Sequence, residues 1–129
     1  MAEGKAEAKI AAPPDEVWAL VSDFHGLDTW MPGVDKSEPD GDVRKLQTMG
    51  MEIHEQLQSR DDSARQMSYS IVKAPIPLEH HLATITVLED GGDGCVLVWE
   101  YDVRPDEMAA AMGPVYDGSV QAVKARFES

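Results

Sequence analysis

The sequence is short of cysteine, of positive charge and of long apolar runs, and each shortage excludes a class of protein. Its 129 residues include one cysteine, Cys95, so neither an intramolecular disulfide nor a multi-cysteine metal site can form. Eleven Lys and Arg stand against 24 Asp and Glu, a formal net charge of −13, which argues against nucleic acid or an anionic membrane surface as a partner. No stretch approaches the roughly 20 apolar residues of a membrane span, and residues 1–10 lack the apolar core of a signal peptide. We therefore expect an acidic, cytoplasmic protein with no membrane span.

What is present is typical of one soluble globular domain, which we expect to span residues 1–129. Hydrophobic residues make up 43% of the chain and charged residues 27%, and the length is close to that of one domain. The chain has no Walker loop, dinucleotide fingerprint, serine elbow, calcium loop or zinc pattern. We therefore expect no cofactor and no metal. Net charge governs solubility and steering, so the acidity leaves an apolar ligand inside the protein open.

The periodicity of apolar residues predicts strands along most of the chain. Ala6, Ala8 and Ile10 alternate with polar residues, as in a half-buried strand. After Pro13 and Pro14 we expect a short helix over 15–21 and a second helical piece over 24–30, broken at Gly26. Six further strand-like runs cover 34–37, 43–49, 51–59, 65–72, 81–88 and 95–103.

The connections between these runs favour an antiparallel sheet. An acidic turn over 38–42, a two-proline loop over 73–78 and a Gly-rich hairpin over 89–94 join successive strands. A helix is predicted from Pro105, at its first position, to Phe127, with one apolar face. A helix of this length can cover one face of the sheet, and a curved sheet around it can leave a hollow. That apolar face consists of Met108, Met112, Val115, Tyr116, Val120, Val123 and Phe127.

This order of elements, together with several short motifs, resembles the START-like (SRPBCC) superfamily. In order, the motifs are Ala12-Pro13-Pro14-Asp15-Glu16-Val17-Trp18, Asp23-Phe24, Trp30-Met31-Pro32, Glu55-Gln56-Leu57, Met67-Ser68-Tyr69-Ser70-Ile71 and Pro75-Ile76-Pro77. The pattern is most similar to the polyketide cyclase/dehydrase and lipid transport group, and it also resembles plant abscisic acid receptors and lachrymatory factor synthase. The resemblance implies an α+β helix-grip fold, in which a curved antiparallel sheet of about seven strands wraps around a long C-terminal helix and two short helices follow the first strand. Its members include enzymes, receptors and carriers, so fold alone does not decide function.

Arg44 and Glu55 are charged residues in the apolar register of two neighbouring strands. Arg44 shares a face with Leu46, and Glu55 shares one with Ile53. Each could satisfy the other's charge inside the protein, as a structural ion pair. Alternatively, Arg44 would bind a ligand oxygen and Glu55 would move a proton. The resemblance to lachrymatory factor synthase implies the second, catalytic interpretation.

His81 is the third catalytic candidate. It shares parity with Ala83 and Ile85 and should therefore point inward. The plant synthase has a functional Tyr near this position, so the resemblance keeps an acid–base candidate here while leaving the same reaction in doubt. A core histidine bonded to a neighbour is the alternative.

Methionines and aromatic residues are the candidates for lining a ligand cavity, with ordinary core packing as the alternative. Methionine adapts to irregular gaps, and buried tyrosines need partners for their hydroxyls. The two-proline loop, by resemblance to abscisic acid receptors, is a candidate lid. The expected ligand-binding residues are Trp30, Met31, Met51, Tyr69, Pro75, Ile76, Trp99, Tyr101, Met108, Met112 and Tyr116.

Three functions remain open at this point. The first is binding of a small hydrophobic molecule, a lipid, polyketide or similar compound, between the sheet and the C-terminal helix. The second is a cofactor-independent cyclase, dehydratase or isomerase in which Arg44 and Glu55 act with His81 or Tyr69. The third is a protein-interaction module. We expect a monomer or a homodimer.

Overall fold

A computed structural model describes residues 3–128 and shows seven strands and three helices in that range. The elements are β1 (Glu3–Ile10), α1 (Pro14–Val21), the 3-10 helix η1 (Phe24–Thr29), β2 (Val34–Asp40), β3 (Val43–Thr48), β4 (Met51–Asp61), β5 (Gln66–Lys73), β6 (His80–Glu89), β7 (Cys95–Arg104) and α2 (Asp106–Glu128). Gly26 has non-helical backbone angles and kinks η1. The predicted helix-grip architecture is thereby confirmed.

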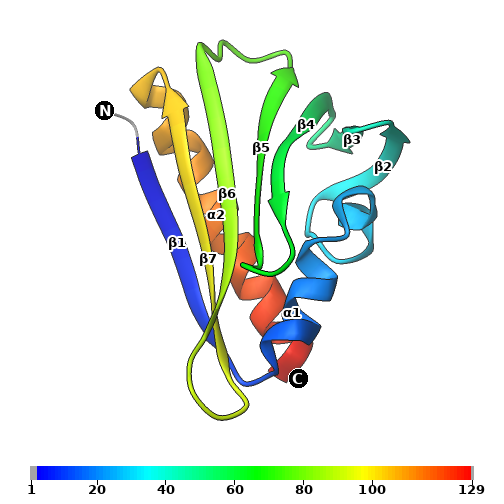
Figure 1. The fold of residues 1–129 in the computed structure, drawn as a ribbon. Coiled ribbons are helices and arrows are strands. Elements are labelled where there is room, and N and C mark those ends of the chain that lie inside the picture. Colours follow the sequence, from blue (N-terminus) through cyan, green and yellow to red (C-terminus); the bar gives the residue numbers. More distant parts are fainter. Residues whose placement is uncertain (1–2, 129) are drawn as a thin grey trace.

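The seven strands form one antiparallel sheet in the order β1-β7-β6-β5-β4-β3-β2. The sheet curves around α2, which crosses behind it (Figure 1). α2 packs on β1 and β7, where Ala6 and Ala8 are small enough for the helix to approach. Val120 and Val123 fill this contact and are almost fully buried. The other strands diverge from the helix, which leaves space on the β3–β5 side.

Most element boundaries differ from the sequence prediction by one or two residues, and two of the differences involve proline. β2 continues through Pro39 to Asp40, so the expected acidic turn shrinks to Gly41 and Asp42. Proline is tolerated there because β2 is an edge strand. α2 begins at Asp106, and the Pro105 carbonyl accepts the first helical N–H bonds, so Pro105 takes the cap position and not the first helical one.

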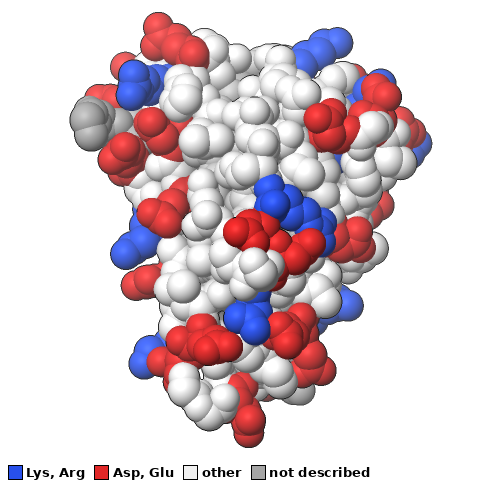
Figure 2. All heavy atoms as spheres, in the orientation of Figure 1, with Lys and Arg blue, Asp and Glu red and all other residues white. Residues whose placement is uncertain are grey.

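Charged side chains lie on the outside of this fold. On the face shown in Figure 2, Asp and Glu side chains outnumber Lys and Arg and lie mostly around the edges and the lower end. Within residues 3–128, no helix is long and apolar enough to cross a membrane. The charge of −13 is therefore a property of the surface, while the interior contains few charged groups.

Candidate functional site

A cavity of about 270 Å³ lies between the N-terminal half of α2 and strands β3, β4 and β5. Its size is near the lower end of the range for small-molecule sites, and its wall is largely apolar with a few polar groups, as such sites usually are. The lining residues are Leu27, Met31, Val34, Arg44, Leu46, Thr48, Met49, Met51, Ile53, Glu55, Tyr69, Ile71, Ile76, Met108, Ala111, Met112, Val115 and Tyr116.

Methionine dominates the apolar part of the wall. Five of the seven methionines in the sequence line the cavity. Met49 is 63% exposed and lies in the β3–β4 turn, where it and Gly50 both have positive φ (52° and 74°). A methionine in this conformation is unfavourable, since such turns prefer Asn, Asp or Gly. Because methionine side chains are unbranched and polarisable, these five residues let the cavity wall adapt to ligands of irregular shape.

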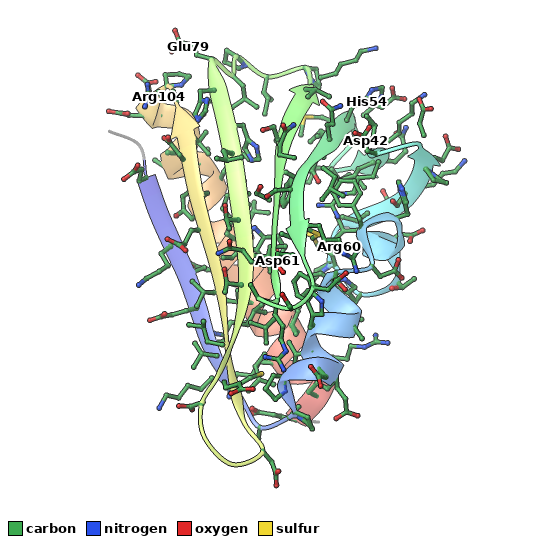
Figure 3. All side chains as sticks on the ribbon, in the orientation of Figure 1. Asp42, His54, Arg60, Asp61, Glu79 and Arg104 are labelled. Carbon is green, nitrogen blue, oxygen red and sulfur yellow. The ribbon has the colours of Figure 1, made fainter. Side chains whose placement is uncertain are left out.

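The loop between β5 and β6 supplies another part of the wall through Ile76. Its end is fixed to the last residue of β7, two residues before α2 begins, because the Glu79 N–H donates to the Arg104 carbonyl (2.8 Å). Glu79 and Arg104 lie at the same end of the sheet in Figure 3. The loop is therefore held beside the first turn of α2, where Met108 also lines the cavity.

Arg44 and Glu55 form a buried ion pair on adjacent strands. They are direct partners in the β3–β4 register, and both Nε and Nη2 of Arg44 lie 2.7 Å from Oε1 of Glu55. Nη1 of Arg44 donates to the Phe24 carbonyl (2.9 Å). The guanidinium carbon lies 4.1 Å from the centre of the Phe24 ring and 4.7 Å from that of Tyr69. Hydrogen bonds therefore engage all three guanidinium nitrogens of Arg44, two aromatic rings contact it, and the residue is 1% exposed.

Glu55 keeps one carboxylate oxygen for other partners. Within the part of the chain that the structure describes, its hydrogen bonds from Arg44 go to Oε1, and none is made by Oε2. Glu55 also lines the cavity. Of the two members of the pair, Glu55 is the one placed to accept a hydrogen bond or a proton from a bound molecule.

His81 points inward, as its register predicts, but it lies behind the cavity wall. It is 5% exposed. Its Nδ1 accepts the Ile71 N–H (3.0 Å), and its Nε2 lies 2.7 Å from the hydroxyl oxygen of Tyr116. Burial, and next to it the neighbouring His80, lowers the pKa of His81 to about 4. His81 therefore contacts the Tyr116 hydroxyl and is not itself part of the lining.

Two neutral tyrosines, Tyr69 and Tyr116, line the cavity. The Trp99 Nε1–H donates to the hydroxyl oxygen of Tyr69 (3.2 Å). Burial raises the pKa of Tyr69 and of Tyr116 far above the ordinary tyrosine value, so both keep their protons across the physiological range. Tyr69, Tyr116 and Glu55 thus line the cavity with the methionines, as do Arg44 and Thr48, whose hydrogen bonds go to other protein groups.

Four of the expected ligand-binding residues do not line the cavity. Trp99 is fully buried in the core, where it contacts the edge of Tyr69. Tyr101 stacks on Tyr116 with ring centres 4.5 Å apart. Trp30 packs near Trp99, and Pro75 is exposed beside Ile76. The other expected lining residues, Met31, Met51, Tyr69, Ile76, Met108, Met112 and Tyr116, do line it.

Several lining residues were missing from the sequence expectation. Leu46 and Ile53 share strand faces with Arg44 and Glu55, so the same period-2 pattern could have placed them in the wall. Phe24, which contacts Arg44 but does not line the cavity, could not be found in this way, because this contact joins η1 to β3 across 20 residues of sequence. Within residues 3–128, no three His, Cys, Asp or Glu side chains gather as a metal-binding group.

Comparison with known proteins identifies the family. The family model described as polyketide cyclase/dehydrase and lipid transport matches residues 1–128. The chain therefore belongs to this family, and its fold is START-like, as the motifs predicted. No curated protein matches the sequence at the required significance.

Solved structures agree with this assignment. The protein XoxI from Bacillus cereus is 30% identical, with a TM-score of 0.92 over 98% of this chain and 96% of that one. A START superfamily protein from Mycobacterium smegmatis is 15% identical, with a TM-score of 0.81 over 98% and 97%. The Zhui aromatase/cyclase from a Streptomyces species is 18% identical, with a TM-score of 0.76 over 98% and 93%. The last two likenesses concern the fold.

Proposed function

We propose that this protein binds a small, mostly apolar molecule in the cavity between β3–β5 and α2. The observation that supports this most strongly is the methionine-rich cavity wall, which also contains the polar side chains of Glu55, Tyr69 and Tyr116. Apolar walls supply affinity, and a few fixed polar groups orient the ligand. The description of the family, which includes lipid transport, supports the same function.

Filling part of the cavity with a large side chain is expected to weaken binding without unfolding the protein. Ala111 is exposed and lines the cavity, so the indole of an Ala111→Trp variant would occupy the ligand's space. With 2-isopropylnaphthalene as the probe, we expect calorimetry to show at least about tenfold weaker binding, a loss of about 1.4 kcal/mol. Saturating probe, at about 100 times Kd, should stabilise the wild type by about 2.7 kcal/mol.

The matched control is Ala110→Trp. Ala110 is the adjacent exposed residue on α2 and does not line the cavity. We expect this variant to bind the probe as the wild type does. Equal binding by the two tryptophan variants would place the apolar ligand elsewhere, and no binding by the wild type would contradict the proposed function.

Cofactor-independent cyclase, dehydratase or isomerase activity is the second candidate function, and the unbonded Oε2 of Glu55 in the cavity favours it. The geometry alters the expected roles. Arg44 positions Glu55, and His81 acts only through Tyr116, so proton transfer would involve Glu55 with Tyr69 or Tyr116. Conversion of a bound carbonyl compound by the wild type, lost in Glu55→Gln, would separate this candidate from simple binding.

Of the three functions, protein interaction has the least support. Among residues 3–128, the exposed large apolar side chains are Met49, Val72, Leu82 and Leu88. Met49 belongs to the wall of the cavity. Val72, Leu82 and Leu88 lie on β5 and β6. Among the described residues, these three are the exposed large apolar side chains that a protein partner could contact outside the cavity.

A further inference from the structure

We propose that the Tyr116 hydroxyl donates a hydrogen bond to the ligand, and that the cavity therefore selects a neutral ketone or aldehyde over a hydrocarbon or a carboxylate. This inference rests on the proposed binding function and adds the chemical class of the ligand. It follows from the direction of the hydrogen bonds around His81, which can be derived from the identity of each partner.

The backbone determines which nitrogen of His81 carries the proton. The Ile71 N–H lies 3.0 Å from Nδ1, and a backbone amide can only donate. Nδ1 must therefore present its lone pair. A neutral imidazole has one N–H, so the proton is on Nε2.

This tautomer sets the direction of the next bond. Nε2 lies 2.7 Å from the Tyr116 hydroxyl oxygen, and because Nε2 carries a hydrogen, His81 donates and Tyr116 accepts. The hydrogen of the Tyr116 hydroxyl is not used in this bond. The Tyr116 hydroxyl can therefore donate its hydrogen to a further partner.

The ring of Tyr116, a residue of the cavity wall, is held in place by its neighbours. Tyr101 stacks on the ring at 4.5 Å with an interplanar angle of 28°. Tyr101 in turn occupies a slot beside Gly4 and Gly113, where an added Cβ would lie 2.4 Å and 3.1 Å from its phenol group. Among the described residues, His81 is the one hydrogen-bond partner of the Tyr116 hydroxyl, which leaves its hydrogen for a bound molecule.

Tyr69, on β5, also has a hydroxyl oxygen that accepts a hydrogen bond from a neighbouring side chain. Trp99 Nε1 is a donor only, so the Tyr69 oxygen accepts its bond and the Tyr69 hydrogen is likewise unused. Two tyrosine donors thus line one cavity. A carbonyl oxygen, which accepts and cannot donate, is the ligand group that matches them.

The charges of the site disfavour an anionic ligand. Glu55 brings a carboxylate to the cavity wall. The one cationic side chain in the lining, Arg44, already binds Glu55 and the Phe24 carbonyl and lies against the rings of Phe24 and Tyr69. A ligand carboxylate would therefore meet a like charge with no free cation to offset it.

Three probes of similar shape test the proposal on the wild type and on Tyr116→Phe: 2-acetylnaphthalene, 2-isopropylnaphthalene and 2-naphthoate. Calorimetry at pH 7 should show that the substitution weakens ketone binding about fivefold to tenfold, the effect of one neutral hydrogen bond, and leaves hydrocarbon binding within about twofold. Hydrocarbon binding also shows that the variant is folded. Naphthoate should bind at least about tenfold more weakly than the ketone to the wild type.

A spectroscopic readout separates hydrogen bonding from a packing effect. With the probe ketone labelled with ¹³C at its carbonyl, the bound carbonyl resonance should lie further downfield in the wild type than in Tyr116→Phe. Tyr101→Phe is the matched control, because the Tyr101 hydroxyl does not line the cavity, and it should leave this resonance and the ketone affinity unchanged.

The outcomes distinguish this inference from the function on which it rests. If all three probes fail to bind the wild type, the proposed function is wrong, and the inference falls with it. If the neutral probes bind but Tyr116→Phe weakens both equally or neither, the donor role of Tyr116 is overturned while cavity binding stands. Tighter binding of naphthoate than of the ketone would overturn the selection of a neutral carbonyl.

Discussion

Glu55→Leu is expected to lower the free energy of unfolding by about 3–5 kcal/mol, because it leaves a buried charge without its partner. Arg44 is 1% exposed, and a guanidinium cannot lose its proton in a protein. The rings of Phe24 and Tyr69 and the Phe24 carbonyl would remain in contact with it, but no negative charge would. The variant should therefore show its loss at every pH at which the wild type is folded.

Two further variants test whether the unpaired charge of Arg44 causes this loss of stability. Arg44→Met should cost less than Glu55→Leu, since a carboxyl group left alone can take up a proton and become neutral. The double variant Arg44→Met/Glu55→Leu should be more stable than Glu55→Leu alone, because apolar replacement of a whole buried pair is often neutral. Urea unfolding at pH 7 measures all three. A cost below about 1 kcal/mol for Glu55→Leu would mean that the pair is solvated, like a surface ion pair.

Stability is expected to fall as the pH drops from about 6.5 to about 4, with His81 responsible for a large part of the loss. The pKa of His81 is lowered from 6.5 to about 4 by burial and by His80. Between these values the unfolded chain binds a proton that the folded protein excludes, so acid favours unfolding. A difference of this size corresponds to about 3 kcal/mol, present in full above pH 6.5 and lost below pH 4.

The hydrogen bonds of His81 give the same direction. Protonation would place a hydrogen on Nδ1, which accepts the Ile71 N–H in the folded protein, and that bond would be lost. Comparing the wild type with His81→Gln isolates this contribution, because glutamine cannot titrate. The wild type should lose about 3 kcal/mol more than His81→Gln between pH 7 and pH 4. His54 lies on β4, away from this network (Figure 3). His54→Gln is therefore the control and should keep the wild-type pH dependence. Parallel pH profiles for the wild type and His81→Gln would contradict the assignment.

The sequence was sufficient to predict the fold, because alternation and turn residues are local signals. The Ala6-Ala8-Ile10 alternation, the proline pair and the apolar face of the last helix each predicted an element that the structure contains. The errors lie at ends of elements. Pro39 suggested a turn, yet an edge strand accommodates it, and Pro105 caps α2 where a first helical residue was expected.

The candidate site could be predicted only in part. The parity of a residue in a strand tells which face of the sheet it occupies, but not which residues from other elements contact it. Parity placed Arg44, Glu55 and His81 inside. It could not show that Phe24, from a distant helix, covers Arg44, or that Ile71 determines the tautomer of His81. Trp99 faces inward as well, but it lies in the core, while Tyr69 reaches the cavity.

The central claim, that the methionine-lined cavity is the binding site, is tested most directly by NMR of protein labelled with ¹³C at the methionine methyl groups. Titration with 2-acetylnaphthalene should shift the methyl resonances of the five cavity methionines, Met31, Met49, Met51, Met108 and Met112. Met67, fully buried in the core and outside the cavity wall, serves as the internal control and should not move. Shifts absent at saturating probe, or largest at Met67, would contradict the account.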